Sequence, residues 1–409
     1  MAVLAGTGVM VAAACAACGS GPQPSSAYLP RTPGRATVYV VNQGSNTVTP
    51  VFTATRTAGR PIKVANGPDA LGMGPDGKTV YVVSTNYGAN SGSGFVTPIR
   101  TATRMPSGRI RVGDLPFDVA VTPDGKTAWV VNYSTVTPVD TATGRAGRPV
   151  RVVSGVGDHA NAIVISPDGR TAYVATSFTI VPIDLASGRA GKPIPLGNSM
   201  WMQSRIAITL DGRTVYALTG PDLVPVSTAT DKAGKPITAA GAASAITITP
   251  DGKTAYAGSI SGKYPAYVSV VVPISTSTSK AGKPIKVGKP SPDADVSSIA
   301  VTPSGKTAYV AASNALYPIN TLTSKVGRPI TAAPPGYSPS LITISADGKT
   351  AWALSIDNHS GVGLITPIDT ATNKAGKPIH VGANPVCLLV TTGRPIPGPA
   401  QGSCSYIPR

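Results

Sequence analysis

Few side chains of this chain could do acid–base or metal chemistry. Among 409 residues there are 18 Asp, no Glu and three His. Six of the Asp stand in Asp-Gly pairs, which are typical of tight turns. General acid–base catalysis needs carboxyl or imidazole groups close together, and the candidates for it are Asp118, Asp158, His159 and Asp295. Paired-carboxylate chemistry is short of residues, and we expect neither a metal nor a cofactor.

Polar and aromatic side chains that occur once, in loops, are the better candidates, because loops on a rigid scaffold carry most binding surfaces. Trp201 is a large aromatic residue with no strand position to fill. Its ring could stack on a sugar or peptide, or could plug the centre of the fold. The predicted binding residues are Asp69, Asp118, Asp158, His159, Asn161, Trp201, Arg205, Asp295, Tyr337 and His359.

An internal repeat must position these loops. One aromatic residue recurs at intervals of 40 to 53 residues, and one proline follows it in every repeat. A period of about 45 residues belongs to the four-stranded blades of a β-propeller. The aromatic positions are Tyr39, Tyr81, Trp129, Tyr173, Tyr216, Tyr256, Tyr309 and Trp352, and the prolines are Pro50, Pro98, Pro138, Pro182, Pro225, Pro273, Pro318 and Pro367.

Composition agrees with an all-β fold, since Val, Ile, Thr and Tyr hold most apolar positions and Gly and Pro are frequent. Each repeat divides into four strands, a to d, with an Asp-Gly hairpin between a and b. The first repeat lacks its strand a, and the segment from Pro385 to Val390 has that pattern with nothing after it. We therefore expect eight blades, closed by pairing of the N- and C-terminal strands, with seven blades as the alternative.

The repeat resembles that of the YVTN family of β-propellers. Tyr39-Val40-Val41-Asn42 and Trp129-Val130-Val131-Asn132 are similar to the tetrapeptide that names the family, and the Pro-Asp-Gly-Lys-Thr turns match the rest of its repeat. The resemblance covers about residues 36–391. It implies a scaffold with few assigned activities. Propeller lactonases and streptogramin-cleaving lyases are similar in fold, but their catalytic residues have no matching motif here.

Basic residues dominate the charge, with 35 Lys and Arg against 18 acidic residues and a net charge of +17. Most of them recur in the turns of the repeat, where Lys beside Pro protects an outer strand from aggregation. A belt of this kind could also contact anionic wall polymers or lipid headgroups. No basic cluster with interleaved aromatics points to nucleic acid, and we exclude it as a partner.

The N-terminal segment is typical of export. Residues 2–17 are uncharged and small or apolar, and Ala16-Ala17-Cys18-Gly19-Ser20 resembles the lipobox of bacterial lipoproteins. Plain secretion and an uncleaved tail are the alternatives. We expect a signal peptide over 1–18 with lipidation of Cys18, a tether over 19–35, the propeller over 36–391 and a tail over 392–409. Since exported chains are oxidised, we also expect a disulfide between Cys387 and Cys404, with a free Cys387 as the alternative.

The two faces of such a propeller differ in sequence. The a–b and c–d turns are nearly invariant between repeats, whereas the b–c and d–a loops differ in each repeat. We expect a monomeric binding or interaction scaffold at the cell surface, with a protein, peptide or glycan ligand on the variable face. Drift of unconstrained loops would give the same variation. The alternative is an enzyme of lactonase or lyase type that acts at the mouth of the central channel.

Overall fold

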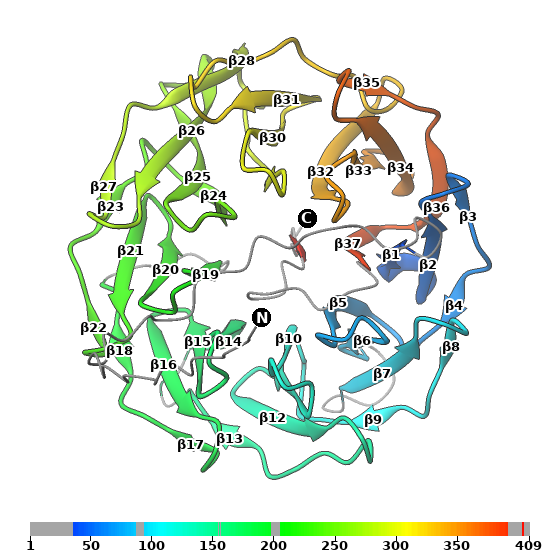
Figure 1. Ribbon diagram of the computed structural model, residues 1–409, viewed down its shortest axis with the longest axis vertical. Helices are drawn as coiled ribbons and strands as arrows, with labels where there is room; N and C mark the ends of the chain where they lie inside the picture. Colours follow the sequence, from blue (N-terminus) through cyan, green and yellow to red (C-terminus); the bar gives the residue numbers. More distant parts are fainter. Residues whose placement is uncertain are drawn as a thin grey trace, which may run out of the picture. The chain divides into compact units, whose positions relative to one another are not determined.

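The computed structural model describes residues 36–86, 94–153, 155, 157–197 and 205–391, together with the backbone of 403–404. Over these residues the chain forms eight small antiparallel sheets arranged as the blades of a β-propeller (Figure 1). The inner strands of neighbouring blades contact one another around a closed circle. The prediction of an all-β, eight-bladed fold is confirmed.

The strands of the first four blades follow in the order a to d, and the outer strand is usually split into two short segments. Blade 1 holds β37 (Pro385–Val390), β1 (Thr37–Asn42), β2 (Thr47–Phe52), β3 (Thr57–Ala58) and β4 (Ile62–Lys63). Blade 2 holds β5 (Pro68–Met73), β6 (Thr79–Ser84), β7 (Phe95–Arg100), β8 (Met105–Pro106) and β9 (Ile110–Arg111). Blade 3 holds β10 (Asp118–Val121), β11 (Thr127–Val131), β12 (Thr135–Asp140) and β13 (Val150–Arg151). Blade 4 holds β14 (Ala160–Ile165), β15 (Thr171–Thr176), β16 (Thr179–Asp184), β17 (Arg189–Ala190) and β18 (Ile194–Pro195).

The other four blades continue around the ring. Blade 5 holds β19 (Ile206–Ile208), β20 (Thr214–Thr219), β21 (Asp222–Ser227), β22 (Lys232–Ala233) and β23 (Ile237–Thr238). Blade 6 holds β24 (Ala243–Ile248), β25 (Thr254–Ser261), β26 (Tyr267–Ser275), β27 (Lys280–Ala281) and β28 (Ile285–Ser291). Blade 7 holds β29 (Ser298–Val301), β30 (Thr307–Ala312) and β31 (Ala315–Asn320), and blade 8 holds β32 (Tyr337–Ile344), β33 (Thr350–Asp357), β34 (Val362–Asp369), β35 (Lys374–Ala375) and β36 (Ile379–Ala383). A 3₁₀ turn, η1 (Gln43–Ser45), joins β1 to β2, and β38 (Ser403–Cys404) pairs with β37.

The aromatic residue and the proline of each repeat face each other across strands b and c in all eight blades, as in the pair of Tyr39 and Pro50. Proline has no N–H to donate to strand d, but its carbonyl remains free to accept. In blade 1 this carbonyl accepts the N–H of Gly59 at 2.7 Å. The same bond recurs in the other blades and holds the split outer strand in place.

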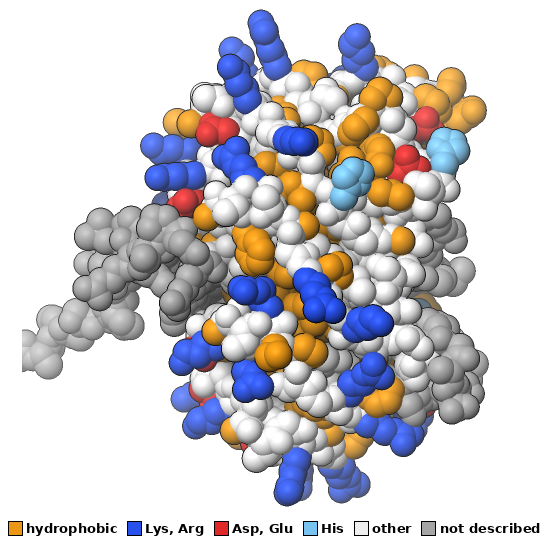
Figure 2. Space-filling view, turned by 90° about the vertical axis from the view of Figure 1, so that its right-hand side faces the viewer, with side chains coloured by type: hydrophobic (Ala, Val, Ile, Leu, Met, Phe, Trp, Pro, Cys, Tyr) orange, Lys and Arg blue, Asp and Glu red, His pale blue; other side chains and the backbone are white. Residues whose placement is uncertain are grey.

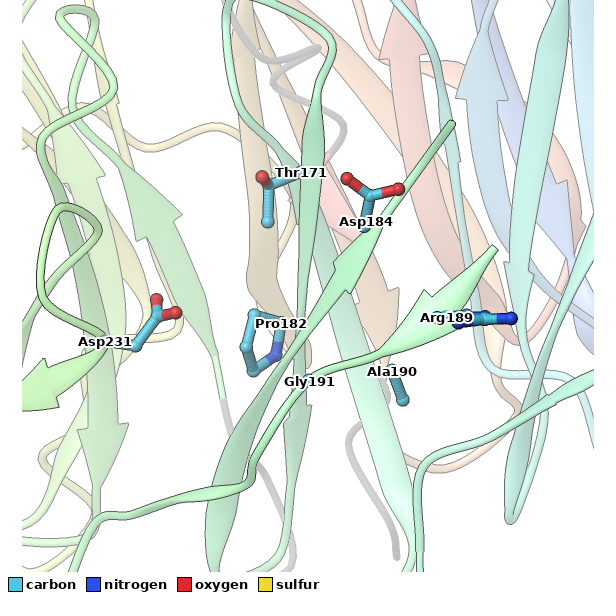
Figure 3. Close-up of a pocket in the computed structure, with 7 residues that line it drawn as sticks. All are labelled: Thr171, Pro182, Asp184, Arg189, Ala190, Gly191 and Asp231. Carbon is cyan, nitrogen blue, oxygen red and sulfur yellow. The ribbon is translucent and has the colours of Figure 1, made fainter. Parts of the chain in front are cut away.

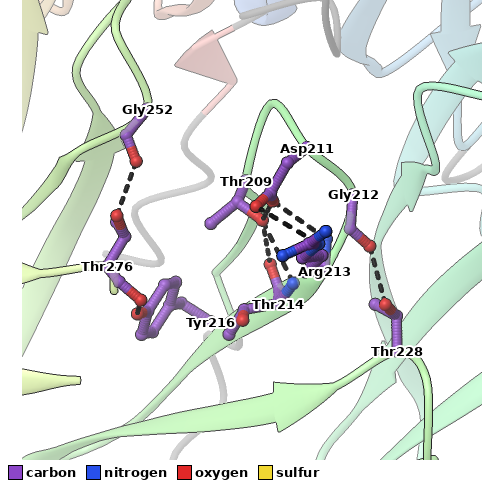
Figure 4. Close-up of polar contacts among 9 residues, drawn as sticks. All are labelled: Thr209, Asp211, Gly212, Arg213, Thr214, Tyr216, Thr228, Gly252 and Thr276. Atoms are coloured by element: carbon purple, nitrogen blue, oxygen red, sulfur yellow. Dashed lines mark hydrogen bonds and ion pairs between the residues drawn. The ribbon is translucent and has the colours of Figure 1, made fainter. Parts of the chain in front are cut away.

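The a–b hairpins carry one repeated set of hydrogen bonds, shown for blade 5 in Figure 4. The carboxylate of Asp211 accepts the hydroxyl of Thr209 at 2.6 Å and the N–H of Arg213 at 3.0 Å. Gly212 follows with a φ of +69°, which Gly adopts without strain. The hydroxyl of Thr228, in the c–d turn, donates to the Gly212 carbonyl at 2.7 Å. These bonds tie the two turns of a blade into one rigid face.

The ring closes where β37 pairs with β1, so that the red C-terminal strand lies beside the blue N-terminal one in Figure 1. The N–H of Thr391 donates to the carbonyl of Thr37 at 2.9 Å, and its hydroxyl accepts the Thr37 N–H at 3.0 Å. Thr122 and Thr127 make the same two bonds within the hairpin of blade 3. Blade 1 therefore keeps the contacts of an a–b hairpin whose loop is absent.

The core lies between blades, where buried side chains of one sheet pack against the next; Val131 of blade 3 and Val174 of blade 4 share one such cluster. Lys and Arg side chains project from the surface at separate points rather than as one patch (Figure 2). Within the described residues, no helix is long and apolar enough to cross a membrane.

Candidate functional site

The inner strands of four blades carry a β-bulge near their N-terminal ends. In β5, β14, β24 and β32 the register shifts there, and one residue on the inner strand has no partner on strand b. A bulge redirects a side chain out of the regular alternation. The bulged residues are Asp69, Asn161, Ser244 and Ser340.

Asp118 links two blades at the start of β10. Its carboxylate accepts the N–H of Val119 at 2.8 Å and the N–H of Ile163, in the inner strand of blade 4, at 3.0 Å. Burial raises the pKa of Asp118 to about 6, against the lowering effect of these two bonds. The residue thus has both a structural task and a proton affinity suited to exchange near neutral pH.

Two further carboxyls lie in or just before the inner strands of other blades, Asp69 in β5 of blade 2 and Asp295 three residues before β29 of blade 7. Asp69 is buried and accepts a hydrogen bond from the Gln43 side chain, and burial raises the pKa of Asp69 to about 7. Asp295 accepts the N–H of Ser313 at 2.6 Å. Loss of hydration raises the pKa of Asp295 to about 6, although part of the residue reaches solvent.

Arg205 reaches across the inner strand of blade 6. It precedes β19 in blade 5, and its guanidinium donates to the carbonyl of Ser297, which precedes β29 in blade 7, at 3.3 Å. Burial lowers the pKa of Arg205 to about 10. No carboxylate of the described chain lies within ion-pair distance of this guanidinium. Within the described residues, the hydrogen bond to Ser297 uses one of the five N–H donors of the guanidinium.

His159 is the centre of a small aromatic group at the channel mouth. Its ring stacks on Tyr133, with centroids 5.5 Å apart and planes at 12°, and Phe117 approaches at 6.3 Å. The Nδ1 atom lies 3.0 Å from the Ser177 hydroxyl. Asp158, next to it, accepts the Ser177 N–H at 2.9 Å. Tyr133 remains 42% exposed, so one aromatic surface faces solvent.

The remaining predicted binding residues either contact neighbouring loops or lie outside the described part of the chain. The Asn161 amide donates to the His159 carbonyl at 3.3 Å, which places it beside the aromatic group. Tyr337 begins β32 opposite Asp357, whose carboxylate accepts the His359 N–H at 2.9 Å within a loop of blade 8. Trp201 and Cys18 lie outside the described residues. Among those described, no three His, Cys or acidic residues converge as metal ligands would.

Sequence reasoning missed Tyr133 and Phe117 as individual site residues. Tyr133 stands in a two-residue b–c loop, and Phe117 is one of only four Phe in the chain. Tyr133 follows the end of a strand, at a position that is aromatic in no other repeat. A large aromatic residue at a loop position of an otherwise regular repeat was the available signal.

Two cavities lie away from the channel, in grooves between neighbouring blades. One of about 290 Å³ lies between blades 4 and 5 and is lined by Asp184, Arg189 and Asp231 among others (Figure 3). The second, of about 420 Å³, lies between blades 2 and 3. Both contain residues of the c–d turns, which the sequence assigned to the invariant face.

Comparison with known proteins supports the fold. No protein-family model and no curated protein matches the sequence. Solved structures do match. Dihydro-heme d1 dehydrogenase NirN is similar over 91% of this chain and 78% of its own, with a TM-score of 0.70 and 15% identity. Hydrazine synthase of Kuenenia stuttgartiensis is similar over 79% and 97%, with a TM-score of 0.55 and 22% identity.

A protein of unknown function from Desulfotomaculum acetoxidans is similar over 72% of this chain and 94% of its own, with a TM-score of 0.54 and 17% identity. Since all three identities are below 25%, these similarities support the propeller fold alone. The neighbours include enzymes as well as a protein without assigned activity.

Proposed function

We propose that this chain is a binding propeller of the YVTN type, which holds a saccharide with an acidic group on the face formed by the b–c and d–a loops. The observation that carries the proposal is the half-exposed Tyr133 ring stacked on His159. Aromatic faces bind the apolar faces of sugar rings, and the hydroxyl and carboxyl groups around them fix orientation.

The acidic group follows from Arg205. A guanidinium that has lost hydration and has no carboxylate partner among the described residues is stabilised by an anionic ligand, and its planar fork fits a carboxylate. A ligand would therefore have its acid at Arg205 and its neutral part against Tyr133.

The test is calorimetric titration with trigalacturonic acid and with neutral chitotriose. We expect the acidic sugar to bind, and both Tyr133→Ala and Arg205→Ala to weaken it by about tenfold or more. Leu322→Ala is the matched control, because Leu322 is 92% exposed in a c–d turn. Equal affinity in Tyr133→Ala and the parent protein would contradict the proposal. Binding of peptides from a library, without binding of the acidic sugar, would show that the ligand is a peptide rather than a saccharide.

A second candidate rests on the raised pKa values of Asp69, Asp118 and Asp295, which suit general acid catalysis near neutral pH. An enzyme of lactonase or lyase type would show turnover of lactones or of the bound sugar. Product formation that Asp118→Asn abolishes, while trigalacturonate affinity stays unchanged, would favour this candidate over the binding scaffold.

We also propose that the protein acts outside the bacterial cytoplasmic membrane, held there by a lipid on Cys18, as a monomer. The lipobox-like sequence supports the anchor. Mass spectrometry of the mature N-terminal peptide from the native cell should find a diacylglyceryl group on Cys18. An unmodified peptide that begins at Met1 would refute export by this route.

A further inference from the structure

Blade 2 departs from the repeat along one continuous hairpin. The last residue of β7 is Arg100, where the equivalent position of blade 8 is Asp369. The outer strand then reads Met-Pro-Ser-Gly-Arg over 105–109, whereas blade 8 has Lys-Ala-Gly-Lys-Pro over 374–378. Six positions change together in a segment that other blades keep nearly constant.

The larger cavity lies against this hairpin. It has a volume of about 420 Å³ and is bounded on the other side by the c–d turn of blade 3. Its lining includes Tyr81, Arg100, Ser107, Arg109, Thr141 and Gly144.

The c–d turn of blade 3 contributes a glycine to this lining. Gly144 has a φ of +67° and no side chain. At the same position in blade 8, Asn373 has a φ of +56° and its Oδ1 accepts the hydroxyl of Tyr309 at 2.6 Å. A side chain therefore projects toward the preceding blade there, whereas between blades 2 and 3 that space is left open.

The charge of the groove is positive. Arg109 donates to the Val64 carbonyl at a long 3.5 Å, and Arg100 makes no side-chain hydrogen bond or ion pair within the described residues. Arg104, in the same hairpin, lies 5.1 Å over the Phe52 ring. No carboxylate lines the cavity.

The acids nearest in sequence to the lining already have partners, and the partner of Asp140 is Thr143, which itself lines the cavity. Asp140 accepts the N–H and hydroxyl of Thr143, both at 2.7 Å, and Asp76 lies 3.8 Å from Lys78. Arg100 and Arg109 are thus two exposed cations on one concave surface, and neither forms an ion pair within the part of the chain that the structure describes.

The groove between blades 4 and 5 is a built-in comparison (Figure 3). It contains the same strand positions, but Asp184 stands where blade 2 has Arg100, and Asp231 stands where blade 3 has Gly144. Its volume is about 290 Å³, and its lining contains one cation, Arg189, and two acids. The net charge of this lining is therefore negative, whereas that of the groove between blades 2 and 3 is positive.

We propose that the groove between blades 2 and 3 is a second binding site, which takes a phosphate monoester of a small polyol. Two guanidinium groups supply the charge and the paired N–H donors that a phosphate dianion requires. The volume exceeds that of a phosphate group alone and leaves room for a polyol against Tyr81 and Ser107. This site is independent of the ligand proposed for the loop face.

The experiment is calorimetric titration of the full propeller, in phosphate-free buffer, with glycerol 1-phosphate and glucose 6-phosphate. Glycerol and glucose are the neutral controls. We expect the phosphorylated compounds to bind, the neutral ones not to bind, and Arg100→Ala with Arg109→Ala to weaken binding at least about tenfold. Arg189→Ala with Lys192→Ala removes the same charge from the outer strand of blade 4, including the one cation that lines the comparison groove, and should leave binding unchanged.

Gly144→Asn tests the site without removing a charge, since Asn tolerates a positive φ and would occupy the cavity. A Cβ at Gly144 meets only Ile110, at 3.6 Å, so this variant should fold. We expect it also to lose binding. Equal affinity in the Arg double variant, or an equal loss in the blade 4 control, would overturn the proposal.

Discussion

Asp118 shows how a single residue serves both the ring and the site. Its carboxylate joins blade 3 to the Ile163 N–H of blade 4, yet burial raises its pKa to about 6. A pKa above the unfolded value means that the folded state binds the proton more tightly. The contribution to stability is thus fully present below about pH 4 and is lost as the pH rises through about 6.

We predict that Asp118→Asn flattens the decline of the free energy of unfolding between pH 4 and 7. A rise in pKa of about two units corresponds to about 3 kcal/mol at most. Urea unfolding at pH 4.5 and pH 7 measures it. Asp140→Asn is the control, because hydrogen bonds from Thr143 lower the pKa of that exposed carboxyl and its titration falls below this window. An equal pH dependence in Asp118→Asn and the parent would contradict the assignment.

At the scale of the element, the c–d turn has one feature common to all blades. Its fourth residue has a positive φ in each, and the residues are Arg56, Arg104, Gly144, Gly188, Asp231, Ser279, Ser324 and Asn373. Where this residue has a polar side chain, the side chain can form a hydrogen bond with the aromatic residue of the preceding blade. The hydroxyls of Ser279 and Tyr216, for example, lie 3.2 Å apart. Gly188 offers nothing to Trp129, whose buried indole N–H has no partner among the described residues.

We predict that Gly188→Asn stabilises the protein by about 1 kcal/mol, because the new amide oxygen can accept the Trp129 N–H. A Cβ at Gly188 meets no atom within 4 Å. Gly188→Ala is the matched control, since it imposes the positive φ without supplying an acceptor and should destabilise. The melting temperature should be highest for Gly188→Asn, intermediate for the parent protein and lowest for Gly188→Ala. Equal melting temperatures for the Asn and Ala variants would count against the hydrogen bond.

The repeat predicted these elements well where residue type and conformation correspond. The Asp-Gly hairpins and the aromatic–proline pairs were predictable, because each position needs one chemical type in every blade. The positive-φ turn position was not, since Arg, Gly, Asp, Ser and Asn all occupy it. The stack of Tyr133 on His159 was also hidden, because it joins loops of two blades, and contacts between blades depend on twist rather than on sequence spacing.

At the scale of the molecule, closure depends on the last inner strand. β37 lies between β1 and β38, and the register places Cys387 directly opposite Cys404. Directly opposed residues on antiparallel strands have Cα atoms about 4.5–5.5 Å apart, which is within the range of disulfides.

We therefore predict a Cys387–Cys404 disulfide that stabilises the ring by about 3 kcal/mol. Cys387→Ser and Cys404→Ser should lower the midpoint of chemical unfolding to similar degrees, and a reducing agent should bring the parent protein to the same value. Alkylation of unreduced protein followed by mass measurement gives a direct reading. Two alkylated thiols in the unreduced protein would exclude the bridge.

The bonds between Thr391 and Thr37 have a consequence for how such a chain could be rewired. Because they repeat those of the intact hairpins, the ring contains seven joined copies of a connection and one severed copy. The chain ends could therefore lie in the a–b hairpin of any blade, because the eight hairpin positions are equivalent. A gene permuted so that the chain begins at Lys126, with residues 391 and 37 joined by a Pro-Asp-Gly-Lys linker, would specify the same circle of blades and would move the free ends to blade 3.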